Sequence, residues 1–154
     1  MGIKSYIGRR TKPQKGSSEN IKVSDYMSTN LITFTPNQSV MEVMNTLIKK
    51  KISGGPVVND KKELIGIISE GDCMKQISNS RYYNQPLENM TVEHHMATDV
   101  ETIDGDMNVF DAADKFLSSR RRRFPIIQHG KLIGLISQKD ILKAAIELKS
   151  HSWK

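Results

Sequence analysis

The sequence carries one segment twice, and this internal repeat constrains the fold more than any other feature. Residues 27–72 correspond to residues 96–140. The offset between the copies falls from 69 to 68 between Pro125 and Gly134, where the second copy has lost one residue. Connections tolerate changes in length that strands and helices do not, so we expect a tight hairpin turn there. A unit of this length, present only twice, predicts two similar half-domains packed on each other, with two related clefts at their interface.

Each copy opens with the pattern expected of a strand followed by a helix. The β-rich runs 31–34 and 100–103 come first. Ser39 and Asn108 then begin amphipathic helices, whose apolar residues recur every three or four positions. An acidic residue three positions after each of them predicts a capping box at both helix starts. After each helix, a proline opens a buried hairpin of two aliphatic strands, predicted at residues 56–58 with 64–68 and at residues 125–127 with 132–136.

A second helix is expected to start near Ser69 in the first copy and near Ser137 in the second. The predicted fold class is therefore α/β, of the α+β kind, with two β-α-β-β-α units in pseudo-twofold tandem. Residues 24–27 and 91–96 predict single helical turns, each leading into the unit that follows it. The predicted divisions are a basic, flexible N-terminal arm (1–20), repeat 1 (21–80), a connector (81–90), repeat 2 (91–149) and a C-terminal tail (150–154).

Composition and charge narrow the class of protein. The formal net charge is +6, but residues 1–20 hold five basic residues against one acidic residue, so the rest of the chain is nearly neutral. The chain has a single cysteine, Cys73, which cannot form an internal disulfide and suits a reducing compartment. The longest aliphatic stretch, residues 64–68, is far too short to cross a membrane. We therefore expect a soluble, cytoplasmic protein.

The most specific motif closes each hairpin and reads GIISEGD at residues 66–72 and GLISQKD at residues 134–140. Each copy follows a proline-opened hairpin, and together they resemble the signature of the cystathionine β-synthase (CBS) domain. The duplication over residues 23–148 resembles a CBS pair, or Bateman module. In that family, clefts between the units bind adenosine-containing ligands such as AMP, ADP, ATP or S-adenosylmethionine, and no chemistry is performed there. CBS pairs commonly dimerise through their helices into a disk of four repeats, which implies a homodimer.

The resemblance assigns ligand contacts to two kinds of segment. Asp72 and Asp140 would hold ribose hydroxyls, because an ionised carboxylate can accept from both hydroxyls at once. Ser69 and Ser137 would lie near the ribose or the phosphates, beside free backbone N–H groups at a helix start. The residues before each proline would supply backbone groups to the base and, where basic, charges to phosphates. They are Ile52, Ser53 and Gly54 in the first repeat and Arg121, Arg122 and Arg123 in the second.

These two pre-proline segments differ in charge. In the family, the Ser/Asp motif of one repeat usually shares a cleft with the pre-proline segment of the other. This would place Asp72 beside the three arginines, and Asp140 beside Ser53 and Gly54. The Asp72 cleft then suits an anionic nucleotide, because the arginines can pair with phosphate. The Asp140 cleft suits a neutral or cationic adenosine compound, or no ligand.

The same residues permit other interpretations. Each serine and aspartate pair is also a capping box that starts a helix, and residues 120–123 also fit a solvated helix end. The basic arm and these arginines would suit nucleic-acid binding, although only Tyr6 and Phe124 stand near them as stacking partners. A purely protein-binding module without a ligand is a further alternative. An enzyme is not expected, because no nucleophile is paired with a base and no histidine spacing is typical of a metal site.

The function predicted from the sequence is therefore regulatory. We expect a stand-alone CBS pair that requires no cofactor and binds an adenosine-containing ligand between its repeats. Such a module would signal occupancy to an unknown effector protein or through self-association.

Overall fold

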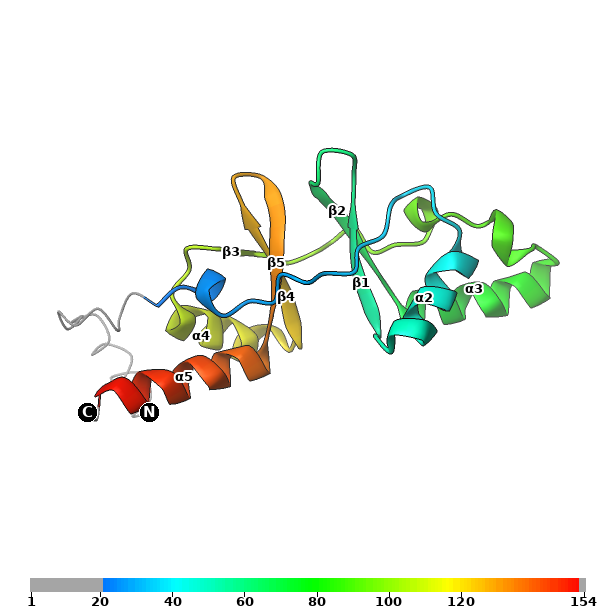
Figure 1. Cartoon of the computed structure of the whole chain (residues 1–154). Helices are drawn as coiled ribbons and strands as arrows, with labels where there is room; N and C mark the ends of the chain where they lie inside the picture. Colours follow the sequence, from blue (N-terminus) through cyan, green and yellow to red (C-terminus); the bar gives the residue numbers. More distant parts are fainter. Residues whose placement is uncertain (1–20, 153–154) are drawn as a thin grey trace.

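The computed structural model describes residues 21–152, so the predicted arm at residues 1–20 lies outside the described residues. Figure 1 shows two halves side by side, each with a β-hairpin near the centre of the molecule and helices on its outer side. The first half contains α2 (Val40–Lys50), β1 (Gly54–Val58), β2 (Leu64–Ser69) and α3 (Glu70–Tyr83). The second contains β3 (Ile103–Asp104), α4 (Val109–Ser119), β4 (Arg123–Gln128), β5 (Lys131–Ser137) and α5 (Gln138–Ser152). Short 3-10 helices are η2 (Val23–Asp25), η3 (Leu87–Asn89) and η4 (Val92–His94).

The predicted α+β class with two similar units is confirmed, but the opening strands are shorter than the sequence indicates. In the first half, Phe34 forms a single parallel bridge with Val57. In the second half, β3 has two residues and pairs in parallel with β4. Each opening segment meets only one edge of its hairpin before it turns toward the next helix, so few of its residues can enter a ladder.

The two hairpins differ where the lost residue predicts a difference. β4 and β5 are joined through His129 and Gly130, both of which have positive φ, of 53° and 77°. Two such residues fit the tight turn whose twist matches antiparallel strands. The first hairpin closes through a longer loop, in which Asn59 Oδ1 accepts from the amides of Lys61 and Glu63 at 2.9 and 3.0 Å. The predicted tight turn is therefore confirmed.

One of the four long helices is capped differently from the sequence expectation. Ser39 forms the predicted capping box with Glu42, but Asn108 accepts instead from the amide of Phe110, two residues on, at 2.7 Å. An asparagine side chain readily makes this shorter-range bond, so α4 starts with an Asx turn. α3 continues to Tyr83, into the predicted connector, and α5 continues to Ser152, into the predicted tail.

The two lead-in turns pack on the opposite halves of the molecule. Val23, in η2, is fully buried in the core of the second half together with Ile103. Val92, in η4, is fully buried in the core of the first half together with Phe34. Each turn leads in sequence into the unit that follows it, as predicted, but its apolar side chain enters the core of the other half. An apolar pattern shows that a residue is buried, and not which core buries it.

Backbone hydrogen bonds fix this exchange on both sides. After η2 the chain runs along β5, where Ser28 and Leu135 exchange two backbone hydrogen bonds of 2.8 and 3.0 Å. After η4 the chain runs along β2, where Ala97 and Ile67 exchange two of 2.8 and 2.9 Å. One residue from the other repeat therefore pairs with the edge of each hairpin. The two halves cannot separate without breaking both pairs of hydrogen bonds.

The motif glycines allow the exchanged segments to come this close. An ideal Cβ on Gly66 would stand 2.9 Å from the carbonyl oxygen of Ala97, and one on Gly134 would stand 2.9 Å from that of Ser28. Carbon atoms of side chains essentially never approach a backbone oxygen so closely, so a larger residue must push the crossing segment away.

We predict that Gly66→Ala lowers the free energy of unfolding by about 1 to 3 kcal/mol, because the added methyl group overpacks the crossing. Gly71→Ala is the matched control, since it lies in α3 and its Cβ would meet only Ser69 Oγ at 3.8 Å. Alanine is the better helix former, so this control should gain about 0.5 to 1 kcal/mol. Urea denaturation measures both, and an equal response of the two variants would contradict the crossing as the cause.

Candidate functional site

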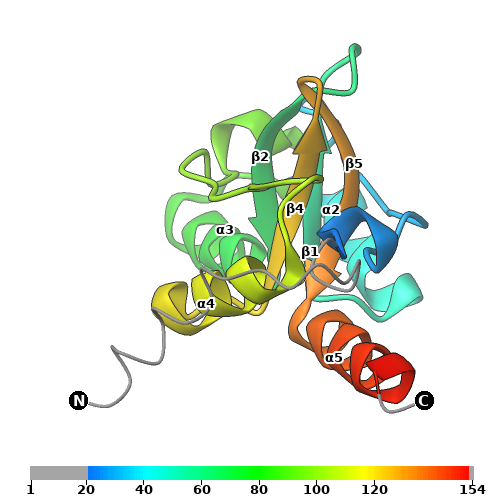
Figure 2. The same ribbon diagram turned by 90° about the vertical axis from the view of Figure 1, so that its left-hand side faces the viewer.

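A cavity of about 350 Å³ lies between the two hairpins and brings most of the predicted ligand segments together. Equivalent residues of the two repeats line it, such as Pro56 with Pro125 and Ile67 with Leu135. Both halves therefore contribute matching walls to the cavity. The hairpins stand next to each other at the middle of the molecule in Figures 1 and 2. The remaining lining residues are Ser53, Gly54, Gly55, Ser69, Arg120, Arg121, Arg122 and Arg123. We call this space the central cavity.

The predicted site residues divide into two groups in the structure. Six of them line the central cavity: Ser53, Gly54, Ser69, Arg121, Arg122 and Arg123. The other four, Ile52, Asp72, Ser137 and Asp140, are not among its lining residues. Ser69 and the three predicted arginines line it together with Ser53 and Gly54, which the resemblance assigns to the other cleft, and neither Ser137 nor Asp140 is among the lining residues. The cavity is thus asymmetric in composition although its walls are symmetric in fold.

The arginines reach the cavity because of how α4 ends. Arg120 is the C-cap of α4 and has a left-handed backbone conformation with φ of 64°, which turns the chain out of the helix. Arg123 then enters β4, opposite Ser137 in the ladder. The equivalent C-cap in the first half, Lys51, has a similar φ of 57° but is followed by uncharged residues. The described lining residues include four arginines and no acidic residue, so the cavity favours anions.

Asp72 and Asp140 cap their helices, as the alternative interpretation predicted. Oδ2 of Asp72 accepts from the amide and the hydroxyl of Ser69 at 2.9 and 3.1 Å. Oδ2 of Asp140 accepts from the same groups of Ser137 at 2.8 and 3.0 Å. Within residues 21–149, no group donates a hydrogen bond to Oδ1 of either carboxylate. Capping therefore occupies one oxygen of each aspartate and leaves the other as an acceptor.

Arg121 is the one cavity arginine with a described ion pair. Its Nε donates to Glu101 Oε1 at 2.8 Å, and both side chains are partly exposed. Sequence reasoning missed Glu101, because no motif contains it. Arg120 belongs to the basic run 120–123 singled out in the sequence but was not among the predicted site residues; it corresponds to Lys51 of the first half.

Another hollow, of about 420 Å³, is lined by residues of the first part of β2. It is larger than the central cavity, but its lining of Glu63, Leu64, Ile65, Gly66, Thr98, Val100, Thr102, Ile127 and Gly130 contains no arginine or lysine. Without a cation it offers little to a phosphate group. We therefore place the candidate site in the central cavity on chemical grounds rather than on size.

Further chemistry is limited in the described part of the chain. No three His, Cys, Asp or Glu side chains among the described residues are grouped as metal ligands would be. Cys73 is buried in the first core, and this burial raises the pKa of its thiol, which keeps it protonated. None of the helices described has the length and apolar character needed to cross a membrane.

Comparison with known proteins identifies the family. The model of the CBS domain matches residues 23–79 and 92–147. The chain therefore belongs to the CBS domain family and contains two CBS domains. Among sequence relatives, a 17.7 kDa protein of Acidianus ambivalens is 31% identical over 133 residues, which cover 86% of this chain and 77% of the relative.

Other relatives are longer than this chain. It spans 42% of protein MJ1225 of Methanocaldococcus jannaschii, which is 28% identical over 124 residues, or 80% of this chain. It also spans 26% of inosine-5'-monophosphate dehydrogenase of Aquifex aeolicus, which is 32% identical over 134 residues, or 86% of this chain. The similar segment is thus a minor part of that enzyme.

Two solved structures of similar fold contain adenosine compounds. CBSX2 of Arabidopsis thaliana, in complex with AMP, has a TM-score of 0.71 and 28% identity, covering 83% of this chain and 98% of that chain. The CBS domain pair of protein MJ0100, in complex with 5'-methylthioadenosine and S-adenosylmethionine, has a TM-score of 0.64 and 27% identity. That match covers 82% of this chain and 97% of the other.

His95, just after η4, adds a titratable group close to Asp72. Partial burial lowers the pKa of His95 below its ordinary value of 6.5, the neighbouring His94 lowers it further, and Asp72 acts in the opposite direction. The folded state therefore binds a proton on His95 less readily than the unfolded chain does. Stability contributed by neutral His95 is complete above about pH 6.5 and is lost as the pH falls through the lower folded-state pKa.

We predict that unfolding midpoints in urea fall between about pH 7.5 and 5.5, and that His95→Gln reduces this fall, because glutamine does not titrate. NMR titration of His95 should show its pKa below 6.5, and Asp72→Asn should lower that pKa further by removing the one favourable charge. A pKa above 6.5 would show that burial does not control the titration of His95, and an unchanged pKa in Asp72→Asn would show that His95 does not sense Asp72.

Proposed function

We propose that this chain is a regulatory module that binds an adenine nucleotide in the central cavity. The observation that carries the proposal is the meeting of Ser69 with the arginines at 120–123 in one space between the two CBS domains. The structures of CBSX2 with AMP and of MJ0100 with adenosine compounds support it, because both cover more than four-fifths of this chain. The module performs no catalysis in this proposal and needs no cofactor.

Each group in and beside the cavity has a proposed role. Arg122 and Arg123 pair with phosphate oxygens, because charge-assisted bonds from a guanidinium are strong and can be bidentate. Oδ1 of Asp72 accepts from a ribose hydroxyl while Oδ2 continues to cap α3. Ser69 contacts the ribose or the phosphates from the start of that helix.

The second proposed cleft, at Asp140 and Ser137, differs in charge. Its partner segment from the first repeat, Ile52, Ser53 and Gly54, carries no cation. It therefore suits adenosine itself or no ligand. S-adenosylmethionine is the weaker candidate for the arginine side, because its sulfonium is positively charged and would be repelled there.

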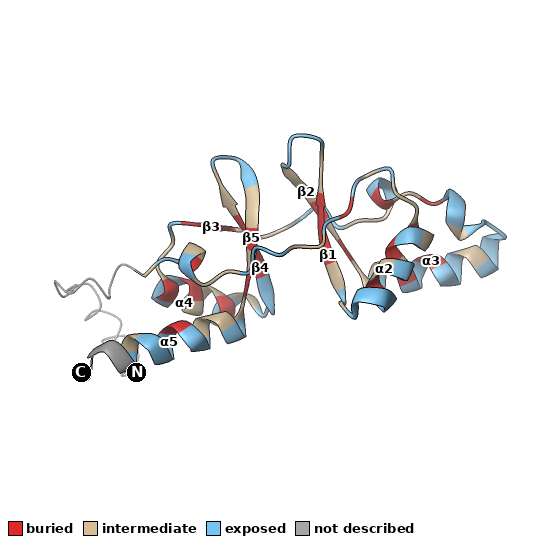
Figure 3. Ribbon diagram, viewed as in Figure 1, coloured by how far each residue is buried: buried red, intermediate tan, exposed pale blue. Residues whose placement is uncertain are grey.

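The output of the module is proposed to be self-association of two copies through their helices. Equivalent apolar side chains are exposed in both halves: Ile48 and Leu117 at 76% and 82%, and Met74 and Leu142 at 63% and 62%. Figure 3 shows exposed surface along these helices. A face built from pseudo-twofold pairs is suited to a symmetric homodimer, in which the same patch is used by both subunits. The proposal also includes an effector protein that binds this dimer. It further includes a location in the reducing cytoplasm.

A purely protein-binding module is the second candidate. It is favoured by Tyr82 and Tyr83 at the end of α3, which are exposed and lie with ring centroids 5.6 Å apart. Nucleic-acid binding is disfavoured, because the arginines line the central cavity whereas the two exposed tyrosines stand at the C-terminal end of α3. Figure 1 shows that this end of α3 points away from the hairpins.

We predict that AMP, ADP or ATP raises the melting temperature. A ligand at a hundredfold its dissociation constant adds about 2.7 kcal/mol, or roughly 5 to 10 °C for a domain of this size. Asp72→Ala should weaken binding about tenfold and cost the free protein about 1 kcal/mol through loss of the cap. Asp140→Ala is the matched control, with the same lost cap. If millimolar adenine compounds leave the melt unchanged, the protein-binding candidate becomes the better account.

We also predict that Ile48→Glu combined with Leu117→Glu converts a dimer to a monomer in sedimentation velocity, because two charges would be buried without partners. Tyr82→Glu is the control, since it is equally exposed at the end of α3. A wild-type protein that sediments as a monomer, or a double variant that still dimerises, would refute the helical interface.

A further inference from the structure

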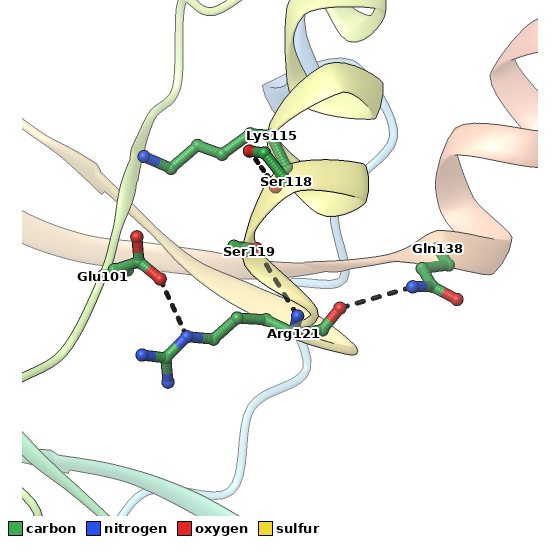
Figure 4. A network of polar contacts seen from close by, with 6 residues as sticks. All are labelled: Glu101, Lys115, Ser118, Ser119, Arg121 and Gln138. Atoms are coloured by element: carbon green, nitrogen blue, oxygen red, sulfur yellow. Dashed lines mark hydrogen bonds and ion pairs between the residues drawn. The ribbon is translucent and has the colours of Figure 1, made fainter.

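Arg121 is held by residues from three other parts of the chain. Its Nε donates to Glu101 Oε1 at 2.8 Å, and its backbone amide donates to Ser119 Oγ at 3.4 Å. Its carbonyl oxygen accepts from Gln138 Nε2 at 3.3 Å. Figure 4 shows these three contacts, which come from the segment before β3, the end of α4 and the start of α5. Both the backbone and the side chain of Arg121 are therefore restrained.

The ion pair restrains the guanidinium in a particular orientation. Glu101 engages Nε, and in Figure 4 the two terminal nitrogens point away from the carboxylate. Within residues 21–149, nothing accepts a hydrogen bond from those terminal nitrogens. A guanidinium has five N–H donors, so four are left for another acceptor. Arg121 lines the central cavity, where such an acceptor would be a ligand anion.

The first repeat has no counterpart of this ion pair. At the internal offset of 69 residues, Glu101 corresponds to Ile32 and Arg121 corresponds to Ile52. Both isoleucines pack against the core of the first half. Equivalent positions of the fold therefore hold two apolar side chains in the first half and an ion pair in the second. The side chains of the ion pair are 45% and 41% exposed, and pairs at this exposure add little stability.

We propose that Glu101 is a positioning residue that orients Arg121 toward the central cavity and so favours ligands that carry phosphate over ligands that do not. This inference rests on the proposed function and deepens it, since it names a residue that sets the ligand class. Glu101 neutralises one of the four cavity arginines, but Arg120, Arg122 and Arg123 keep the space positive. An oriented donor loses less rotamer freedom on binding, and in this proposal that gain exceeds the attraction lost to Glu101.

The test is calorimetric titration of the full chain with ADP and with adenosine. Glu101→Ala removes the contact and should weaken ADP binding about fivefold to tenfold, while adenosine binding changes less than about twofold. Glu101→Gln keeps an acceptor oxygen and should stay within about twofold of wild type for both ligands. Asp99→Ala is the matched control, because it removes the same charge from the same segment and has no described contact with Arg121.

Each outcome decides the proposal. Tighter ADP binding in Glu101→Ala would show that the carboxylate competes with the ligand, and equal losses for ADP and adenosine would show a structural role; either result overturns the inference, as does no change. If wild type binds neither compound, the proposed function fails separately. Titration with inorganic pyrophosphate then tests the arginines alone. The inference is overturned if the wild type does not bind pyrophosphate, or if Glu101→Ala binds it as tightly as the wild type does.

Discussion

The crossing of two exchanged segments over two glycines is the constraint on which the rest of this structure depends. Each lead-in turn is buried in the core of the opposite half and runs beside its hairpin, where Gly66 and Gly134 let the backbone approach. This exchange holds the two hairpins next to each other, and the central cavity is the space left between them. Neither half is complete without residues from the other, so a ligand bound between the halves, as we propose, would contact a surface that is fixed before it binds.

On this symmetric framework the chemistry is one-sided. The pre-proline segments occupy equivalent places, but one carries Ser53 and Gly54 and the other carries consecutive arginines. The difference extends beyond the cavity wall, since an apolar pair in the first half corresponds to the Glu101 and Arg121 ion pair in the second. Duplication therefore supplies the shape of the site, and divergence at a few positions supplies its preference for charge.

The sequence predicted the repeated elements well, because their signals are local. Ser39 and Ser69 cap helices as their spacing indicates, and the lost residue of the second copy is explained by a turn at His129 and Gly130. The exchange of η2 and η4 could not be predicted from one sequence, because burial of Val23 or Val92 satisfies the same apolar pattern in either core. For the site, the motifs identified Ser69 and the arginines, which line one cavity in the structure. Glu101 contacts Arg121 from 20 positions away and belongs to no motif, so the sequence did not indicate it. The capping role of Asp72 was predicted as an alternative, and its ligand role stays a prediction.

The most direct test of the central claim, that the arginines make the central cavity a nucleotide phosphate site, is calorimetric binding of ADP and of adenosine to wild type and to the Arg122→Gln and Arg123→Gln double variant. Loss of two charge-assisted partners should weaken ADP at least tenfold and leave adenosine within about twofold. Equal losses for the two ligands would mean that the arginines act only through the fold. An unchanged affinity for ADP would leave them as surface charge and contradict the account.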